Sequence, residues 1–555
     1  MTHYLTYIDE SIKSNWSNPA LTNYGANSYT YAQVAENVAK LHIMFKHCGI
    51  EKGDKVAICA KNSAEWCIAF LGIVTYDAVA VPLLCDFLPQ NIADLIKVSE
   101  CKLAFVDKYV YNGFSRANII DNFKEYNELK ALVNVANSSV KLDCSSVFAD
   151  FDLEKEFSVK YPDGVKPGDV DYAKEDLDAL TVISYTSGTS SSPKGVMLPA
   201  KSLSGNLLFA REYVPTVPAG NTFSILPLAH IFGLSLDFLF MFSKGCHIHL
   251  FSAKPVPAIL LKALGEVKPF LFLTVPLLIE KIFRAKVLPT LDKPVMKILT
   301  AIPGIRSLIY KKVRNTILSA FGGNLHISGF FIGGAAISKE VEVVMRKIKL
   351  PFAVGYGMTE CGPLISYKGW NHPALKNNAG IIHPNIEVRI DSAEPAEVPG
   401  EIQVRGNLVT TGYYKNEEAT KAAFTDDGWF KTGDMGTMDA NEYVIIRGRC
   451  KNMILTGSGQ NIYPEEIEEL INAQPLVMES LVVGRKHGLV AIIVIDKDAV
   501  KASGVDENDL QSMMEDRMSE LNTQLPVYSK ISKCELRDIP FEKTPKLSIK
   551  RFMYH

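Results

Sequence analysis

An apolar run, Leu180 to Ile183, is followed by the segment Tyr185-Thr186-Ser187-Gly188-Thr189-Ser190-Ser191-Ser192-Pro193-Lys194-Gly195. The segment combines backbone N–H groups, several hydroxyl side chains and one lysine, which suits the binding of a polyphosphate. It is not a Walker A loop, because no Gly-Lys-Ser/Thr follows a first glycine at the required spacing. A surface turn is the alternative, since serine, glycine and proline cluster in turns. The rest of the chain decides between the two interpretations.

The bulk composition is that of a multidomain globular protein. The 555 residues are 47% hydrophobic and 22% charged, with a formal net charge of −2. A chain of this length is expected to form two or more domains. The near-balance of charge gives no support to a nucleic-acid partner, which would require a basic face.

The cysteines and the N-terminus indicate a cytoplasmic protein. The ten cysteines include no C-x-x-C pair and none at zinc spacing with histidine, and free thiols fit a reducing compartment. Residues 1–6 lack the basic and apolar regions of a secretory signal. The most apolar region, 223–251, carries His230, Asp237 and Lys244, so it favours a buried core segment over a membrane span. We expect at most peripheral membrane contact.

Strand and helix patterns alternate in the N-terminal region. Thr30 and Gln33 form a possible capping box before a helix that ends near Gly49. The expected strands are 56–59, 79–83 and 103–106, with helices over 64–74 and 92–98 between them. This alternation predicts a parallel sheet covered on both faces, in which ligands bind at the carboxyl ends of strands. The 185–195 loop follows such a strand.

The rest of the chain is predicted to be a connecting segment followed by further strands and a small unit. Residues 109–177 are charged and irregular, and we interpret them as a connection rather than a separate domain. After Arg449 a smaller, charge-rich unit begins. Further strands are expected at 271–275, 401–405, 442–446, 480–483 and 490–495, and helices at 277–283, 464–471 and 507–521.

Several short motifs follow the 185–195 loop in order. They are Pro227-Leu228-Ala229-His230, Gly333-Gly334-Ala335-Ala336, Gly355-Tyr356-Gly357-Met358-Thr359-Glu360, Lys431-Thr432-Gly433-Asp434, Gly448-Arg449-Cys450-Lys451-Asn452 and Gly457-Ser458-Gly459-Gln460-Asn461. Each is weak alone, but the ordered set covers essentially the whole chain. It resembles the AMP-forming adenylating enzymes, which include acyl-CoA synthetases, luciferases and the adenylation domains of peptide synthetases.

The resemblance implies an α/β fold with two domains. The large N-terminal domain, 1–449, would hold parallel and mixed sheets layered with helices, together with a small distorted barrel. The C-terminal domain, 450–555, would be a small, mobile α+β lid that swings about a hinge near Lys451. One orientation would serve adenylation and the other would admit the thiol, and closure would keep water from a reactive anhydride.

The residue types also fit the chemistry of adenylation. A carboxylate that attacks the α-phosphate of ATP is itself an anion, so cations and N–H donors must offset the repulsion. Lys194 supplies a cation, and Glu360 is the candidate ligand for Mg²⁺, which prefers oxygen ligands. Asp434 is a natural acceptor for ribose hydroxyls, although a turn aspartate is the alternative. A strand end that turns into a loop is likewise the alternative for 355–360.

The resemblance assigns further roles. Thr359 would contact the α-phosphate, Arg449 the ribose or phosphate, and Tyr356 the adenine. His230 would lie beside the acyl carboxylate and the thiol path, although a core histidine is the alternative, and Gly459 would line the pantetheine path. The remaining ATP-binding candidates are Thr186, Ser187, Gly188, Thr189, Ser190, Gly333, Gly334, Ala335, Gly357, Met358 and Lys451.

Two positions depart from the family pattern. Ser191 stands where the phosphate loop usually carries glycine, and glycine reaches positive φ at no cost. Ser548 stands where the family carries a lysine that reaches into the adenylation site. Lys546 and Lys550 would flank Ser548 on one face of an extended segment, and we hypothesise that Lys546 replaces the family lysine.

The closest branch by pattern is that of the long-chain fatty acyl-CoA synthetases. Phe232-Gly233 lacks the aspartate that binds the substrate amino group in peptide synthetases. The spacing from Arg449 to Pro464 and the ending at 543–551 resemble the long-chain branch. The sequence therefore predicts fatty acid, ATP, Mg²⁺ and CoA as substrates and cofactors. Two alternatives stay open: an enzyme that transfers the acyl group to a carrier protein or stops at the adenylate, and a non-catalytic nucleotide- or acyl-binding protein.

Overall fold

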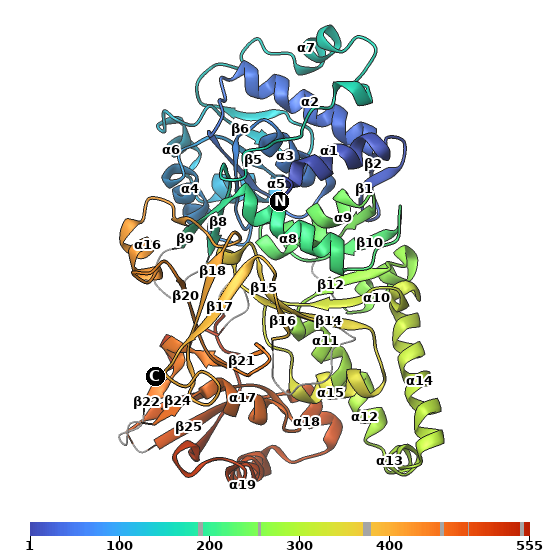
Figure 1. The fold of residues 1–555 in the computed structure, drawn as a ribbon, viewed down its shortest axis with the longest axis vertical. Helices are drawn as coiled ribbons and strands as arrows, with labels where there is room; N and C mark the ends of the chain where they lie inside the picture. Colours follow the sequence, from blue (N-terminus) through green and yellow to red (C-terminus); the bar gives the residue numbers. More distant parts are fainter. Residues whose placement is uncertain are drawn as a thin grey trace.

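The structure of the chain is a computed structural model. It describes residues 1–186, 193–253, 257–369, 379–455, 460–486, 488–543 and 549–554. Figure 1 shows the N-terminal part at one end of the molecule and the C-terminal segment, in orange and red, at the other. The predicted class is confirmed: the fold is mixed α/β, with a large N-terminal part and a small C-terminal part.

The first sheet has eight strands and is parallel in its centre. Its order is β19-β9-β8-β4-β3-β5-β6-β7, and the five central strands, β8, β4, β3, β5 and β6, run parallel to one another. At both edges the pairing is antiparallel. The bounds are β3 Lys55–Cys59, β4 Val79–Pro82, β5 Cys101–Val106, β6 Ala131–Asn134, β7 Val140–Asp143, β8 Leu180–Thr186, β9 Lys194–Pro199 and β19 Gly412–Tyr413.

Helices cover both faces of this sheet, as the alternation predicts. Val56 and Ile58 of β3 share one core with the buried faces of α2 and α3, whereas Ala57 and Cys59 pack with α4 and α5 on the other side. The Thr30–Gln33 capping box is present at the start of α2. The helices are α1 Tyr4–Ser14, α2 Tyr31–His47, α3 Ala64–Thr75, α4 Pro89–Val98, α5 Lys108–Arg116, α6 Ile120–Lys124 and α7 Leu153–Lys160.

Part of the segment predicted as a connection belongs to the sheet. Between residues 109 and 177, β6 and β7 extend the eight-stranded sheet at its edge. The strand β6 is only Ala131–Asn134, and β7 is partly exposed. Such short strands, one without an apolar face, give little periodic signal, which explains why the sequence pattern misses them.

The second sheet has the order β12-β13-β14-β15-β16 and lies beside the first. The inner residues Leu273 and Phe331 join the same core as β3, so α8 and the segment after it lie between the two sheets. Phe272 and Phe330 face the other way, toward α10, α11 and α15. The bounds are β12 Leu271–Thr274, β13 Gly329–Ile332, β14 Phe352–Gly357, β15 Leu364–Lys368, β16 Ile381–Ile382, α8 Ala200–Tyr213, α9 Phe240–Ser243, α10 Pro257–Val267, α11 Pro276–Ile282, α12 Leu288–Leu291, α13 Pro294–Ala301, α14 Pro303–Ala320 and α15 Lys339–Lys347.

Two four-stranded sheets complete the large part. The first, β10-β11-β1-β2, contains β1 Pro19–Asn23, β2 Ser28–Thr30, β10 Asn221–Ser224 and β11 His247–Leu250. The second is antiparallel, in the order β17-β18-β20-β21. Its strands are β17 Ile386–Asp391, β18 Gly400–Gly406, β20 Phe430–Met438 and β21 Val444–Arg449, and α16 spans Glu417–Ala423. It carries the short alternating strands that the sequence predicts from residue 401.

The C-terminal unit has a three-stranded sheet, β24-β25-β26, with its own apolar core. It touches the large part: the Arg284 guanidinium donates to the Asn472 carbonyl at 2.7 Å, and the Lys339 N–H donates to Glu469 at 3.0 Å. The elements are β22 Ile454–Leu455, β23 Asn461–Ile462, α17 Pro464–Asn472, β24 Val477–Arg485, β25 Gly488–Ile495, α18 Lys497–Ser503, α19 Leu510–Asn522 and β26 Ile531–Arg537.

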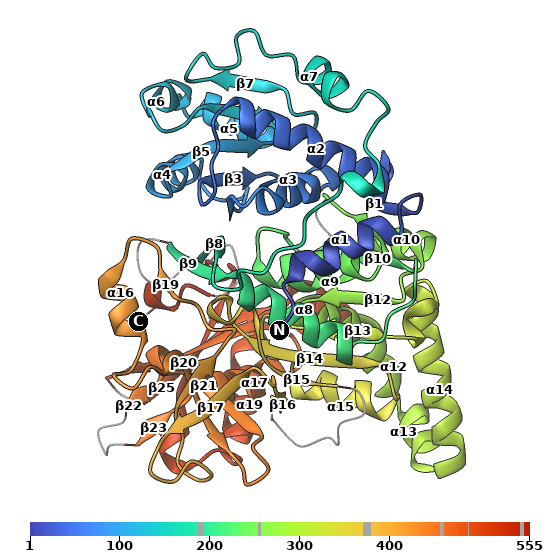
Figure 2. The same ribbon diagram turned by 45° about the horizontal axis from the view of Figure 1, so that its top comes forward.

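The apolar segment 223–251 is part of the core, as predicted. Phe223, Phe238 and Phe242 are fully buried, and the residues from Gly233 to Leu239 form a π-helix. Within the described residues, no helix combines the length and the apolarity needed to cross a bilayer. Figure 2 shows this segment between the two large sheets, near α1 and α8.

Buried histidines give the fold a predictable sensitivity to acid. Burial lowers the pKa of four histidines from 6.5 to about 4, namely His3, His42, His249 and His383. The unfolded chain therefore binds protons that the fold does not, so stability is present above pH 6.5 and is lost as pH falls toward 4. Each such histidine contributes at most about 1.4 kcal/mol per pH unit within that window.

The His383→Gln variant tests this effect. His383 is fully buried, and its Nδ1 accepts from the Asn385 N–H at 3.1 Å. We expect the melting temperature of the variant to fall less between pH 7 and pH 5 than that of the unaltered protein. The exposed His326 is the matched control, and His326→Gln should leave the pH dependence unchanged. Identical pH profiles for His383→Gln and the unaltered protein would contradict the expectation.

Candidate functional site

The predicted phosphate loop connects two antiparallel strands. Thr186, the last residue of β8, lies opposite Lys194, the first residue of β9. Lys194 therefore stands at the open end of a hairpin, where its ammonium lies 4.9 Å from the centre of the Tyr413 ring. Five residues of the loop lie outside the described residues, namely the candidates Ser187, Gly188, Thr189 and Ser190 and the position Ser191, where the family usually has glycine.

Tyr413 connects Lys194 to Glu360. The Tyr413 hydroxyl donates to Glu360 Oε1 at 3.0 Å, and Glu360 is only 8% exposed. Burial, followed by the Glu360 charge, raises the pKa of Tyr413, so the phenol stays a hydrogen-bond donor. The Thr410 N–H also donates to the Glu360 carbonyl at 2.7 Å. The result is a cation, an aromatic ring and a carboxylate in series beside the hairpin.

The sequence gives no local signal for Tyr413. It belongs to β19, a two-residue strand that pairs antiparallel with β9 and so reaches Lys194 from a distant part of the chain. A lone tyrosine beside a glycine is typical of many strand ends. Only the pairing of β19 with β9 reveals its position.

The turn that carries Thr359 and Glu360 is held tightly. These residues form a 3₁₀ turn, Thr359–Cys361, directly after β14. A Cβ at Gly357 would lie 2.0 Å from the Pro363 carbonyl oxygen, so only glycine fits there. Asn206 of α8 donates to the Cys361 carbonyl at 3.2 Å and accepts from the Leu364 N–H at 3.1 Å. The motif is therefore a strand end that turns, and these contacts hold the backbone of the turn in place.

Asp434, Arg449 and Tyr356 form a second cluster. Arg449 Nε lies 2.9 Å from Asp434 Oδ1, and the Tyr356 hydroxyl donates to Asp434 Oδ2 at 2.8 Å. Asp434 is 5% exposed, whereas the Arg449 side chain is 54% exposed. Burial raises the pKa of Asp434, and the Arg449 charge opposes that rise. Glu360 contributes to the same rise, so the two clusters influence each other electrostatically.

Asp434 lies in a strand and not in the turn that is the alternative for a Thr-Gly-Asp sequence. It is part of β20, directly opposite Arg449 on β21. Gly433 has a positive φ of +72°, which makes the strand irregular at this point. Its N–H donates to Glu401 at 3.0 Å. The Thr-Gly-Asp sequence is typical of a turn, and here it is absorbed into a strand because both neighbours continue the pairing.

The glycines at 333–334 lie against the His230 segment. A Cβ at Gly333 would lie 3.0 Å from the Phe232 ring, and Gly334 has φ +87°. The His230 carbonyl accepts from the Leu234 N–H at 2.9 Å, at the start of the π-helix. Two segments therefore adjoin here. His230 lies in the segment after β10, and the two glycines and Ala335 lie in the segment after β13.

Two of the C-terminal candidates, Lys451 and Lys550, lie within the described residues. Lys451 lies in the 3₁₀ turn Cys450–Asn452 after β21. Lys550 Nζ lies 3.4 Å from Glu542 Oε2 within the C-terminal unit. Gly459, Lys546 and Ser548 lie outside the described residues. Met358 follows β14, and its N–H donates to the Pro363 carbonyl at 2.9 Å.

The two clusters bring together carboxylates, cations and hydroxyl groups, but they form no metal cage. Within the described residues, no group of three or more histidine, cysteine, aspartate or glutamate side chains is placed to hold a metal. A single buried carboxylate, that of Glu360, fits Mg²⁺, which usually takes one or two carboxylates and completes its shell with phosphate oxygens and waters.

Comparison with known proteins shows what this chain resembles. The AMP-binding enzyme model matches residues 8–414, and the AMP-binding enzyme C-terminal domain model matches residues 451–554. The long-chain-fatty-acid–CoA ligase FadD15 of Mycobacterium tuberculosis is 26% identical and covers 94% of this chain and 89% of its own. The putative acyl-CoA synthetase YngI of Bacillus subtilis is 27% identical over 82% of this chain and 80% of its own.

Solved structures share the fold at lower identity. ATP-bound MatB from Rhodopseudomonas palustris has a TM-score of 0.75 at 22% identity and covers 100% of this chain and 98% of its own. The anthranilate CoA ligase AuaEII, in complex with anthranoyl-AMP, has a TM-score of 0.77 at 18% identity and covers 99% of this chain and 96% of its own. The ordered motifs and the two clusters agree with the family model, which spans residues 8–414. The chain therefore belongs to the AMP-binding enzyme family.

Proposed function

We propose that this chain activates a long-chain fatty acid with ATP, releases pyrophosphate, and transfers the acyl group from the adenylate to CoA. The substrate class rests on relatives that are named long-chain-fatty-acid–CoA ligases and match most of the chain. The adenylation step rests on one structural observation: Lys194, Tyr413 and Glu360 meet at the open end of the β8–β9 hairpin.

In the first step the fatty acid carboxylate attacks the α-phosphorus of ATP. A bond forms between a carboxylate oxygen and phosphorus, and the bond to the bridging oxygen breaks, so pyrophosphate leaves. Lys194 offsets the repulsion between the two anions and stabilises charge in the transition state. Thr359, in the turn fixed by Asn206, supplies a hydroxyl toward the α-phosphate. The Tyr413 ring lies against the Lys194 ammonium at the hairpin end.

Mg²⁺, when bound with ATP, would neutralise phosphate charge at the Glu360 carboxylate. The hydrogen bond from Tyr413 holds one oxygen of that carboxylate in place. Tyr413 therefore acts as a positioning residue, which fixes both Lys194 and Glu360 relative to the hairpin.

The nucleoside would bind at the second cluster. The Asp434 carboxylate accepts the ribose hydroxyls, and Arg449 holds the carboxylate in orientation at 2.9 Å. The Tyr356 hydroxyl donates to this carboxylate. Gly333 and Gly334 follow β13, which pairs with the strand β14 that carries Tyr356. These glycines leave room for adenine to approach the backbone.

In the second step the CoA thiolate attacks the acyl carbonyl carbon, and AMP leaves. We propose that residues 1–449 form the adenylation domain and that 450–555 form a lid hinged near Lys451, with His230 and Gly459 beside the thiol path. The two family models, which end at 414 and begin at 451, support this division. All ten cysteines are free thiols, which supports a reducing compartment such as the cytoplasm.

A pyrophosphate-release assay over carboxylic acids of increasing length, with and without CoA, tests this function. We expect release that depends on a long-chain acid and turns over continuously only when CoA is present. Turnover with a phosphopantetheine-loaded carrier protein instead of CoA would identify the carrier protein as the acceptor. If none of the acids leads to pyrophosphate release, the result contradicts the proposal and favours a non-catalytic binding protein.

The replacement of the family lysine gives a separate prediction. We expect Lys546→Ala to slow acyl-adenylate formation by at least tenfold, about 1.4 kcal/mol of barrier. Lys550→Ala is the matched comparison, because the Lys550 ammonium lies beside Glu542. If neither variant slows adenylation by tenfold, no lysine at these positions replaces the residue missing at Ser548.

A further inference from the structure

Helices α13 and α14 form a hairpin that exposes an unusual amount of apolar side chain. The exposed fractions are 66% for Val295, 67% for Ile298, 46% for Ile302, 36% for Ile305 and 69% for Leu308. The helix α13 has no buried residue, and α14 buries only Ile317 and Leu318, near its end. Tyr310 and Val313 are partly buried against the same core, so the core holds the second half of α14 and leaves the first part of the hairpin uncovered. A run of apolar residues at such exposure marks an interaction surface.

The same hairpin is strongly basic. Residues 293–320 contain six lysines and arginines and no aspartate or glutamate, namely Lys293, Lys297, Arg306, Lys311, Lys312 and Arg314. Lys297 pairs with Asp292 at 3.3 Å, just before this run. Within the described part of the chain, no ion pair engages Arg306, Lys311, Lys312 or Arg314. The charge on the hairpin is therefore left available for an anionic partner.

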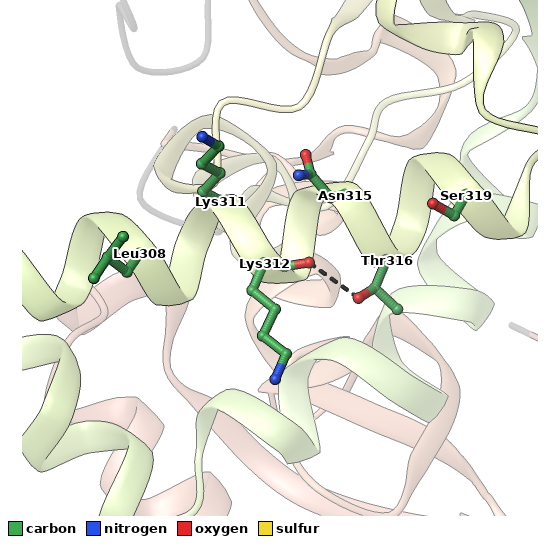
Figure 3. A pocket seen from close by; sticks show the side chains of 6 residues that line it. All are labelled: Leu308, Lys311, Lys312, Asn315, Thr316 and Ser319. Carbon is green, nitrogen blue, oxygen red and sulfur yellow. Dashed lines mark hydrogen bonds between the residues drawn. The ribbon is translucent and has the colours of Figure 1, made fainter.

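The apolar and basic side chains share one face of α14. Ile305, Leu308 and Lys312 follow at spacings of three and four residues, which places them one above another along a helix. Ile317 is nine residues after Leu308, about half a turn away around the axis, on the buried side. Figure 3 shows Leu308 at one end of a shallow hollow on this helix, with Lys311 and Lys312 extending from it in different directions. The hollow is lined by Leu308, Lys311, Lys312, Asn315, Thr316 and Ser319.

The hairpin stands at the outer edge of the molecule. In Figure 1, α14 runs along one side of the protein and α13 lies at its far corner, and Figure 2 keeps both at the periphery. Neither helix contributes a residue to the Lys194–Tyr413–Glu360 or the Tyr356–Asp434–Arg449 cluster. A partner can therefore occupy this face without entering the candidate active site.

We propose that the α13–α14 hairpin docks the protein on an anionic lipid surface. Apolar side chains of this exposure can enter the interfacial region of a bilayer while neighbouring lysines and arginines bind anionic headgroups. The hairpin lies on the surface and does not span it, because its helices are short and carry charges along their length. A second copy of the chain is a poorer partner, since a face with cations and no carboxylates repels itself across a symmetric contact.

Vesicle co-sedimentation of the full chain, without ATP or fatty acid, tests the proposal independently of the enzymatic function. The probes are vesicles of phosphatidylcholine alone and vesicles with about one third phosphatidylglycerol. We expect tighter binding to the anionic vesicles and weakening by salt. The variant L308S/K311E/K312E should bind anionic vesicles at least about tenfold more weakly, since each basic residue near an anionic surface contributes substantially to binding.

The matched control is K155E/V159S/K160E in α7. It makes the same three kinds of change on another exposed helix, where Val159 is 73% exposed. We expect it to bind vesicles as the unaltered protein does. If the α14 variant unfolds, K311Q/K312Q replaces it, with a smaller expected loss. Absence of binding to anionic vesicles, or an equal loss in the α7 control, overturns the proposal. A dimer that the α14 variant dissociates, without vesicle binding, overturns it in favour of a second copy.

Discussion

Replacing Glu360 with glutamine is expected to slow acyl-adenylate formation by at least about a hundredfold. Glutamine keeps the size of the side chain and can still accept the hydrogen bond from Tyr413, so the turn 359–361 is preserved. The variant removes the negative charge that would hold Mg²⁺ beside the phosphates. Loss of one preorganised electrostatic contact in an active site typically costs a factor of a hundred to a thousand.

Two measurements separate this effect from a loss of structure. The apparent Mg²⁺ requirement of pyrophosphate release should rise in Glu360→Gln, while the melting temperature changes little. Tyr413→Phe is the matched control, because it removes only the hydrogen bond at 3.0 Å and keeps the ring beside Lys194. We expect it to slow adenylation by about tenfold, the equivalent of one hydrogen bond. A Glu360→Gln variant with an unchanged Mg²⁺ requirement would contradict the proposed role.

Replacing Asp434 with asparagine is expected to raise the KM for ATP by about a hundredfold. The carboxylate is proposed to accept two ribose hydroxyls, and hydrogen bonds to a charged group contribute about 1.5–3 kcal/mol each. Asparagine has a single acceptor oxygen, and Arg449 loses its partner at 2.9 Å. The KM for the fatty acid should stay close to its original value, because no other cluster residue changes.

An exposed aspartate–arginine pair supplies the control. Asp427 lies 2.6 Å from Arg389 on the protein surface, so Asp427→Asn removes a similar pair that shares no residue with the Tyr356–Asp434–Arg449 cluster. That variant should leave the KM for ATP unchanged. If both substitutions raise the KM for ATP equally, the Asp434 effect is structural and the ribose role is wrong.

Much of the fold follows from periodic patterns in the sequence. The strands at β3, β4 and β5 and the helices at α2, α3 and α4 lie close to their predicted positions. Each of these strands is a short apolar run between helices, so local burial and the parallel alternation agree. The strand β6 and its neighbour β7 escape prediction because one is short and the other is half exposed at the sheet edge.

The candidate site could be predicted only in part. The motif residues Thr359, Glu360, Asp434 and Arg449 are found from the ordered set, and Asp434 and Arg449 lie opposite each other on neighbouring strands. Tyr413 could not be found, because its position depends on the pairing of β19 with β9 across more than two hundred residues. Local sequence patterns carry no information on such a contact.

The measurement that tests the account most directly is the fate of carboxylate oxygen. A long-chain fatty acid labelled with ¹⁸O in its carboxyl group is incubated with the protein, ATP, Mg²⁺ and CoA, and the AMP is analysed by mass spectrometry. If the carboxylate attacks the α-phosphorus and the thiolate then attacks the carbonyl carbon, each AMP carries one ¹⁸O atom. Formation of acyl-CoA with unlabelled AMP, or with ADP in place of AMP, would contradict an acyl-adenylate mechanism.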